Sequence, residues 1–143
     1  MTEHEKVAQD LFNQGCNCAQ ASFAPFAADA ELSQDQALRI ASAFGGGIAK
    51  SGNLCGALSG ALMAAGVCKG YGLGVTPEEK SAFADQMKEL YDRFEAEFSS
   101  VMCHELKAKN EQDIADGKLC PEGKACMRYV LFATKLAEEF IEK

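Results

Sequence analysis

Apolar residues recur at helical spacing along this chain, and no segment alternates with the period of two that is typical of a strand. Val7, Ala8, Leu11 and Phe12 form the first apolar stripe, and Gly15 is suited to end it. The pattern predicts further helices near residues 18–26, 34–44, 54–67 and 77–98, a short one from Cys103, and a last one over 124–142. We therefore predict one all-α domain, residues 1–143, built as a compact bundle of about five or six helices.

Capping signals set the expected ends of these helices. Thr76-Pro77-Glu78-Glu79 and Ser33-Gln34-Asp35-Gln36 are both capping boxes. Gly45-Gly46-Gly47 closes the third helix, a loop runs through Gly52, and Asn53 is placed to cap the next helix. Residues 110–117 read as a polar loop.

The chain has seven cysteines, and four of them stand at expected helix starts: Cys18, Cys55, Cys103 and Cys126. Backbone N–H groups and the helix dipole at such a position favour a thiolate over a thiol. Thiolates bind soft metals, attack disulfides and become oxidised. The sequence therefore predicts a helical scaffold that gathers sulfur, with these four as candidate catalytic residues or metal ligands.

Other residues near these cysteines are weaker candidates. Gly56 and Gly60 lie four apart on a face of small residues, which indicates tight helix packing, room for a cofactor, or both. His104 reads as an exposed residue or as a ligand or base, and Cys120 is an alternative to Cys126 or a resolving thiol. Cys16 and Cys68 are less favoured, because one lies at a glycine turn and the other ends its helix.

Charge and hydropathy narrow the class of protein. The net charge is −7, and there is no cluster of Lys and Arg, so a nucleic-acid partner is not expected. The N-terminus is polar, and the most apolar run, residues 54–67, is too short to span a bilayer. We expect a cytoplasmic protein without a membrane partner, where reduced thiols serve metal or redox chemistry rather than a disulfide framework.

The cysteine spacing excludes several familiar sites. The chain has neither the paired Cys-x-x-Cys knuckles of structural zinc sites nor the close cysteine run of ferredoxins. A thioredoxin-type Cys-x-x-Cys is missing as well. If the sulfurs meet, they must do so through tertiary structure, each from a different helix start.

Five segments taken together resemble a known family. They are Asn17-Cys18-Ala19-Gln20, Gly45-Gly46-Gly47, Cys55-Gly56-Ala57-x-x-Gly60, Cys103-x-Glu105-Leu106, and Cys126 with Val130. In order and spacing they resemble the redox-active family named for its C_GCAxxG_C_C pattern, over residues from about 5 to 140. The family label writes GCAxxG where this chain reads Cys55-Gly56-Ala57. The resemblance implies a small bacterial or archaeal cytoplasmic protein with a redox role and four signature cysteines, Cys18, Cys55, Cys103 and Cys126.

Three functions remain open at this point. The first is thiol–disulfide chemistry among the four cysteines, with an unidentified redox partner. The second is binding of an iron–sulfur cluster or a single metal ion by the same four thiolates. The third is a regulatory module whose Gly/Ala face holds a small ligand or a partner helix. Exposed stripes on the short helices would also allow a homodimer.

Overall fold

The computed structural model describes residues 1–121 and 124–143, and these residues form seven α-helices and three short 3₁₀ helices. The prediction of an all-α fold is confirmed, whereas five or six helices was too low a number for the described residues. In chain order the elements are α1 (Glu3–Asn13), α2 (Cys18–Phe23), η1 (Ala24–Phe26), η2 (Ala28–Ala30), α3 (Gln34–Ala41), η3 (Ser42–Phe44), α4 (Gly56–Lys69), α5 (Pro77–Phe98), α6 (Cys103–Ala115) and α7 (Met127–Ile141).

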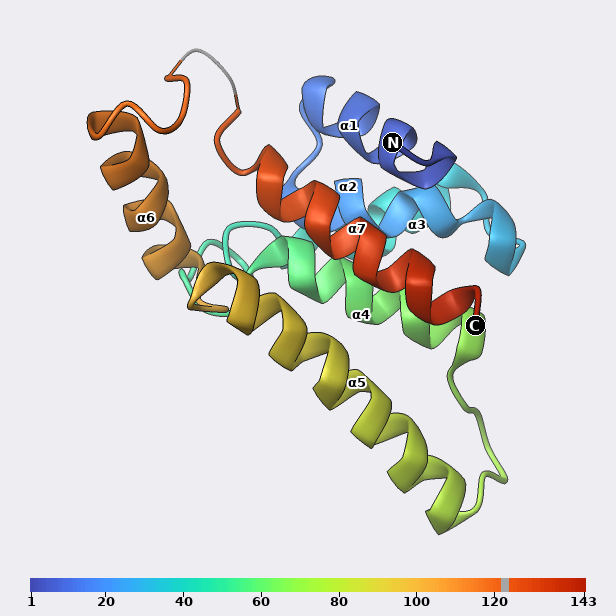
Figure 1. Ribbon diagram of the computed structural model, residues 1–143. Coiled ribbons are helices and arrows are strands. Elements are labelled where there is room, and N and C mark those ends of the chain that lie inside the picture. The colour runs from blue at the N-terminus through green and yellow to red at the C-terminus, as the bar shows by residue number, and fades with distance from the viewer. Residues whose placement is uncertain (122–123) are drawn as a thin grey trace.

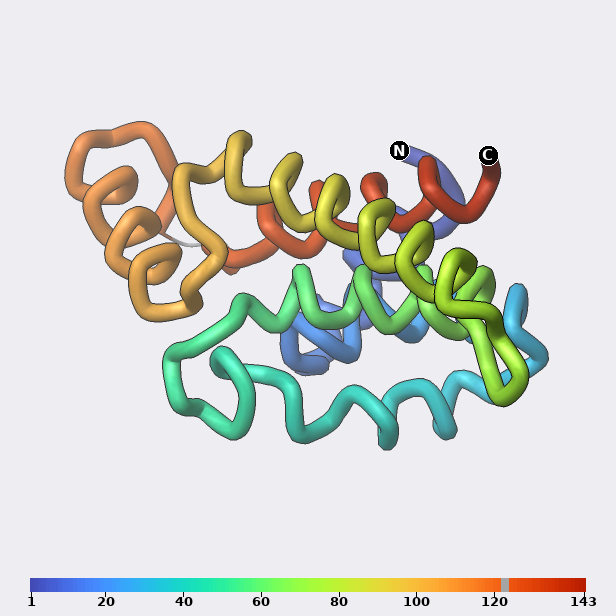
Figure 2. The backbone as a smooth tube through the Cα atoms, turned by 90° about the horizontal axis from the view of Figure 1, so that it is seen from below, coloured from blue at the N-terminus to red at the C-terminus, as the bar shows by residue number. Residues whose placement is uncertain are grey.

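Helices α2, α4 and α7 form the centre of the bundle, and α1 lies along α7 (Figure 1). Helix α5 packs against α4 and α7, whereas α6 projects from one end of the bundle. Figure 2 shows the loop of residues 45–55, in teal, at that same end. None of the described helices combines the length and the apolarity that crossing a bilayer requires.

Helices α2 and α4 approach each other closely because α4 carries glycines where they meet. A Cβ atom on Gly60 would lie 1.9 Å from Ser22 Oγ and 2.6 Å from the Ala19 carbonyl oxygen. Ser22 Oγ donates a hydrogen bond to the Ala57 carbonyl oxygen at 2.9 Å, so the contact also satisfies a buried hydroxyl. Around Gly60, the small-residue face of α4 is therefore covered by α2 of the same chain.

The start of α4 differs from the prediction. Asn53 does not cap this helix, which begins at Gly56 with Cys55 as its N-cap residue. Leu54 instead pairs with Met102 in an isolated antiparallel bridge. The Cys55 N–H donates to the Val101 carbonyl oxygen at 2.8 Å, so backbone pairing sets this boundary rather than a side-chain cap. The bridge places the starts of α4 and α6 side by side.

Two further helix boundaries differ from those predicted from the sequence. Helix α6 continues to Ala115, where a polar loop from residue 110 was expected. Asn110 is only 4% exposed, because its side chain bonds to residues of α7. The last helix starts at Met127 rather than at Lys124, with Cys126 as its N-cap residue.

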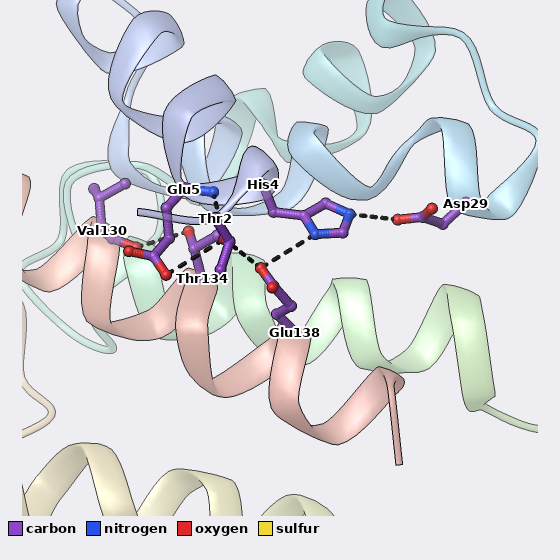
Figure 3. Close-up of polar contacts among 7 residues, drawn as sticks. All are labelled: Thr2, His4, Glu5, Asp29, Val130, Thr134 and Glu138. Carbon is purple, nitrogen blue, oxygen red and sulfur yellow. Dashed lines mark hydrogen bonds and ion pairs between the residues drawn. The ribbon is translucent and has the colours of Figure 1, made fainter.

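A histidine holds the start of α1 against the rest of the bundle (Figure 3). His4 Nε2 lies 2.7 Å from Asp29 Oδ2, and His4 Nδ1 lies 3.2 Å from Glu138 Oε2. The imidazole ring stacks on Phe26 with 4.3 Å between ring centroids. Thr2, the N-cap residue of α1, donates to the same Glu138 oxygen at 2.6 Å. These contacts tie α1 to η2 and to the end of α7.

Candidate functional site

The four predicted cysteines line one cavity of about 160 Å³. Cys18 is the first residue of α2, Cys55 the N-cap of α4, Cys103 the first residue of α6, and Cys126 the N-cap of α7. The expectation that these cysteines stand at helix starts is confirmed, and tertiary structure brings the four starts together. We call this space the cysteine cavity; its other lining residues are Phe12, Asn17, Gly46, Gly56, Leu106, Lys107 and Tyr129.

The glycine run ahead of α4 lets the loop pass close to this cavity. A Cβ atom on Gly45 would lie 2.6 Å from the Asn17 side chain, which caps α2 and so positions Cys18. Gly47 has φ of +74°, and a Cβ there would lie 2.7 Å from Cys103 Cβ. The sequence indicated these glycines as a helix end and as part of the family pattern, without a role at the site. Their role is to bring backbone against two of the site's helix starts.

Cys126 is the thiol best suited to ionise. A hydrogen bond from Cys18 lowers the pKa of Cys126 to about 7, against the opposing effect of burial. A second hydrogen bond comes from Asn110 Nδ2, 3.4 Å from the sulfur, and the charges of Lys107 and Arg128 act in the same direction. At neutral pH about half of a thiol with this pKa is thiolate, compared with about 3% for an ordinary cysteine with a pKa of about 8.5.

The other three cysteines remain protonated at neutral pH. The hydrogen bond to Cys126 and burial raise the pKa of Cys18 well above its usual range, so Cys18 keeps its proton and shares it with Cys126. Burial raises the pKa of Cys55 to about 11, although the N–H groups of Leu58 and Ala57 act against it. Burial also raises the pKa of Cys103, against the charge of Lys107. The expectation that a helix start favours the thiolate is therefore wrong for these three. Desolvation outweighs the helix terminus at Cys55 and Cys103, and the interaction with Cys126 together with desolvation does so at Cys18.

Helix α6 supplies polar residues that the sequence analysis missed. Asn110 Oδ1 accepts hydrogen bonds from Arg128 Nη2 at 2.6 Å and from the Tyr129 hydroxyl at 2.8 Å, while its Nδ2 donates to the Cys126 sulfur. Cys103, Lys107 and Asn110 are spaced i, i+4 and i+7, which places them on one face of a helix. That spacing was the available signal, and it was lost when residues from 110 onward were assigned to a loop.

The remaining candidates lie outside the cysteine cavity or only border it. Cys120 is exposed and lines no part of the cavity, whereas Cys126 does. Gly56 lines the cavity, but Gly60 lies in the contact between α2 and α4. His104 is exposed and faces a neighbouring cavity. Cys16 and Cys68 are half-buried against the core and are not among the cavity's lining residues.

The spacing of the sulfurs bears on which metal group they fit. Among the described residues, no three cysteine sulfurs lie within 4.8 Å of one another. A single tetrahedral ion with bonds of about 2.3 Å holds its sulfur ligands only about 3.8 Å apart. The four sulfurs are therefore spread too widely for one ion as they stand. An all-cysteine donor set spread around a cavity instead fits the ligation of an iron–sulfur cluster.

Comparison with known proteins identifies the family of this chain. The model of the family described as "Putative redox-active protein (C_GCAxxG_C_C)" matches residues 16–140, and the chain belongs to this family. A protein of Archaeoglobus fulgidus named "Uncharacterized protein" is 39% identical over 69 residues, a stretch that covers 46% of each chain. The match thus spans about half the length of that relative. No solved structure matches the chain.

Proposed function

Starting from membership of the C_GCAxxG_C_C family, we propose that this chain is a dithiol redox protein in which Cys126 attacks and Cys18 resolves. The observation that carries the proposal is the single cavity that Cys18 and Cys126 line together with Cys55 and Cys103. The interaction between Cys18 and Cys126 also shifts the pKa values of the two thiols in opposite directions, down for Cys126 and up for Cys18. The thiolate is the attacking species, and Cys126 is the cysteine whose pKa lies near neutral pH.

The cycle consists of two exchanges. The Cys126 thiolate attacks one sulfur of a substrate disulfide RS–SR, forms the mixed disulfide Cys126–S–S–R, and releases RS⁻. The Cys18 sulfur then attacks Cys126 Sγ, releases the second RS⁻, and closes the Cys18–Cys126 disulfide. The two leaving thiolates take up two protons, of which Cys18 supplies one and water the other. The substrate gains two electrons and the protein loses two, so an external dithiol must reduce the protein again.

The coupling between the two thiols suits this order of events. While Cys126 carries the negative charge, it holds the proton on Cys18. Formation of the mixed disulfide removes that charge and the acceptor, so the pKa of Cys18 falls when its thiolate is needed. Burial keeps Cys55 and Cys103 protonated, and these two cysteines take no part in the two exchanges. The cytoplasm, where such a dithiol is kept reduced, is the proposed compartment.

A second candidate is an iron–sulfur cluster held by the same four cysteines. The observation in its favour is the set of four cysteines that line a cavity of about 160 Å³, in which no three of the described cysteine sulfurs lie within 4.8 Å of one another. A bound cluster would supply one-electron transfer. The Asn110 amide that donates to Cys126 Sγ, and the charge of Lys107, would both favour the more negative, reduced form of such a group.

The deciding experiment starts from protein purified without oxygen, with iron and acid-labile sulfide measured first. Metal-free protein is then mixed with 2-hydroxyethyl disulfide, and the products are mapped by peptide mass spectrometry. We expect a Cys18–Cys126 disulfide in the natural protein, a stable mixed disulfide at Cys126 in Cys18→Ser, and no adduct in Cys126→Ser. The matched control is Cys120→Ser, which changes an exposed thiol outside the cavity.

Two results would contradict the proposal. Disulfide formation in Cys126→Ser at the rate of the Cys120→Ser control would remove Cys126 from the attacking role. Iron and sulfide at cluster stoichiometry, lost from each of the four cavity cysteine variants and kept in Cys120→Ser, would establish the second candidate instead.

A further inference from the structure

A second, larger cavity adjoins the cysteine cavity. Its volume is about 640 Å³, within the range of roughly 300–1,000 Å³ that is typical of small-molecule sites. Asn17, Gly46, Cys103 and Lys107 line both cavities, so the two spaces adjoin along these four residues. We call this larger space the outer cavity. It is bounded by Asn17, η3, the loop of residues 45–52, and the first turns of α6.

The outer cavity is positively charged on an acidic protein. Lys50, His104 and Lys107 line it, and the described residues contribute no Asp or Glu to its lining. The chain as a whole carries a net charge of −7. The positive charge extends to the reacting sulfurs, because Lys107 lowers the pKa of both Cys103 and Cys126. The lining therefore attracts anions where the rest of the surface would repel them.

A hydrogen bond fixes the orientation of the histidine in this cavity. His104 Nδ1 lies 2.8 Å from the Gly52 carbonyl oxygen, and a carbonyl oxygen can only accept. Nδ1 therefore carries the hydrogen and donates it to this oxygen. The contact ties the first turn of α6 to the loop that forms the opposite wall.

The loop wall is held in an unusual backbone conformation. Gly46, Gly47, Ile48, Ala49 and Lys50 all have φ between +51° and +74°. A non-glycine residue is strained in this region, so the conformation persists only because other contacts enforce it. Two of these contacts are backbone hydrogen bonds, from Ala49 N–H to Ala43 O at 2.8 Å and from Gly52 N–H to Gly46 O at 3.0 Å. The wall that carries Lys50 is thus built into the fold.

We infer that the outer cavity binds the anionic part of a small-molecule disulfide and directs its sulfurs past Cys103 into the cysteine cavity. This inference rests on the proposed dithiol function, for which it names the class of substrate. The volume, the lining that includes Lys50 and Lys107 and no carboxylate among the described residues, and the shared Cys103 wall together favour a compact ligand with carboxylate or other anionic groups. The reaction consists of the same two thiol–disulfide exchanges, with this disulfide as the oxidant.

The test compares three disulfides of similar size and different charge. They are 3,3′-dithiodipropionate, which is anionic, 2-hydroxyethyl disulfide, which is neutral, and cystamine, which is cationic. We expect the reduced protein to react fastest with dithiodipropionate and slowest with cystamine at low salt, and the difference to shrink as salt screens the charges. Lys50→Glu should lower the ratio of the first rate to the last by about three- to tenfold. The matched control is Lys80→Glu, which makes the same charge change at the exposed start of α5 and should leave the ratio unchanged.

Two outcomes separate this inference from the proposed function. Equal rates for all three disulfides, or equal effects of Lys50→Glu and Lys80→Glu, would overturn the inference and leave dithiol chemistry standing. A second measurement needs no redox reaction: suberate, the carbon isostere of dithiodipropionate, is titrated against the protein by NMR. Shifts at residues of the outer cavity that 1,6-diaminohexane does not cause support the anion site even if no disulfide is reduced. The absence of such shifts overturns it.

Discussion

Asn110 offers the sharpest test of how this site lowers a thiol pKa. The side chain is buried, and its Nδ2 donates to Cys126 Sγ at 3.4 Å. Asn110→Leu keeps a similar volume and removes the donor. A hydrogen bond to a charged group contributes about 1.5–3 kcal/mol, and one pKa unit corresponds to about 1.4 kcal/mol. Because this bond is long and Cys18 still donates, we take the lower end of that range and expect the pKa of Cys126 to rise from about 7 to about 8.

The direction of the pH dependence follows from the chemistry of alkylation. Only the thiolate reacts with iodoacetamide, so labelling of Cys126 should rise with pH and reach half its maximum near pH 7 in the natural protein. In Asn110→Leu the midpoint should move to higher pH. At pH 7 the thiolate fraction then falls from about one half to about one tenth, so labelling slows about fivefold. Quantitative mass spectrometry of the Cys126 peptide measures both values.

The same substitution should lower stability, because it leaves Arg128 and the Tyr129 hydroxyl without their shared acceptor. We expect a loss of about 1–3 kcal/mol in the free energy of unfolding. The control is Gln112→Leu, which replaces an exposed amide on the same helix whose side chain bonds only along α6, to Asp116. A folded Asn110→Leu protein whose midpoint equals that of Gln112→Leu would refute the role given to this hydrogen bond.

Three further changes test other contacts. Gly60→Ala would place a Cβ 1.9 Å from Ser22 Oγ of α2, so we expect it to lower the free energy of unfolding in urea by about 1–3 kcal/mol. Gly66→Ala in the same helix meets nothing within 4 Å, so we expect it to raise the free energy of unfolding by about 0.5–1 kcal/mol. Equal effects of the two substitutions would refute the close packing of α2 and α4. Cys18→Ala removes the larger hydrogen bond to Cys126, so the alkylation midpoint of Cys126 should rise above pH 7, and an unchanged midpoint would assign the low pKa elsewhere. His4→Ala removes a stacked ring and two carboxylate contacts, and should speed amide hydrogen exchange in α1 relative to α4 if this residue holds the helix in place.

Local sequence signals predicted most of the helices well. Side-chain caps depend only on neighbouring residues, and the two predicted capping boxes at Ser33 and Thr76 both form. The structure has a third capping box at Asn17. The predictions failed where distant segments decide the structure. Asn53 is a good cap residue by type, but its carbonyl oxygen accepts from the Cys103 N–H at 2.6 Å across the bridge between the two segments.

The sequence predicted which cysteines line the cavity, but not which of them ionises. Position at a helix start selected the four cysteines that line the cavity. It did not indicate which of them ionises, because that depends on burial and on donors from other helices. Cys55 and Cys126 are both N-cap residues, yet the pKa of one is raised to about 11 and that of the other is lowered to about 7. The difference comes from Cys18 and Asn110, which belong to other helices. Cys18 lies far from Cys126 in the sequence, and Asn110 lies 16 residues before it.

The helix that adjusts the reactive thiol is also the one that stands out from the bundle. Figure 1 shows α6 projecting beyond the other helices, so its hold on α7 depends on side chains near its middle. Asp113 forms an ion pair with Arg128 at 2.9 Å, and Asn110 accepts from the same guanidinium. These contacts also set the position of the amide that donates to Cys126. The same polar network therefore holds α6 against α7 and lowers the pKa of Cys126, so a change that loosens the packing of α6 must also raise the pKa of this thiol.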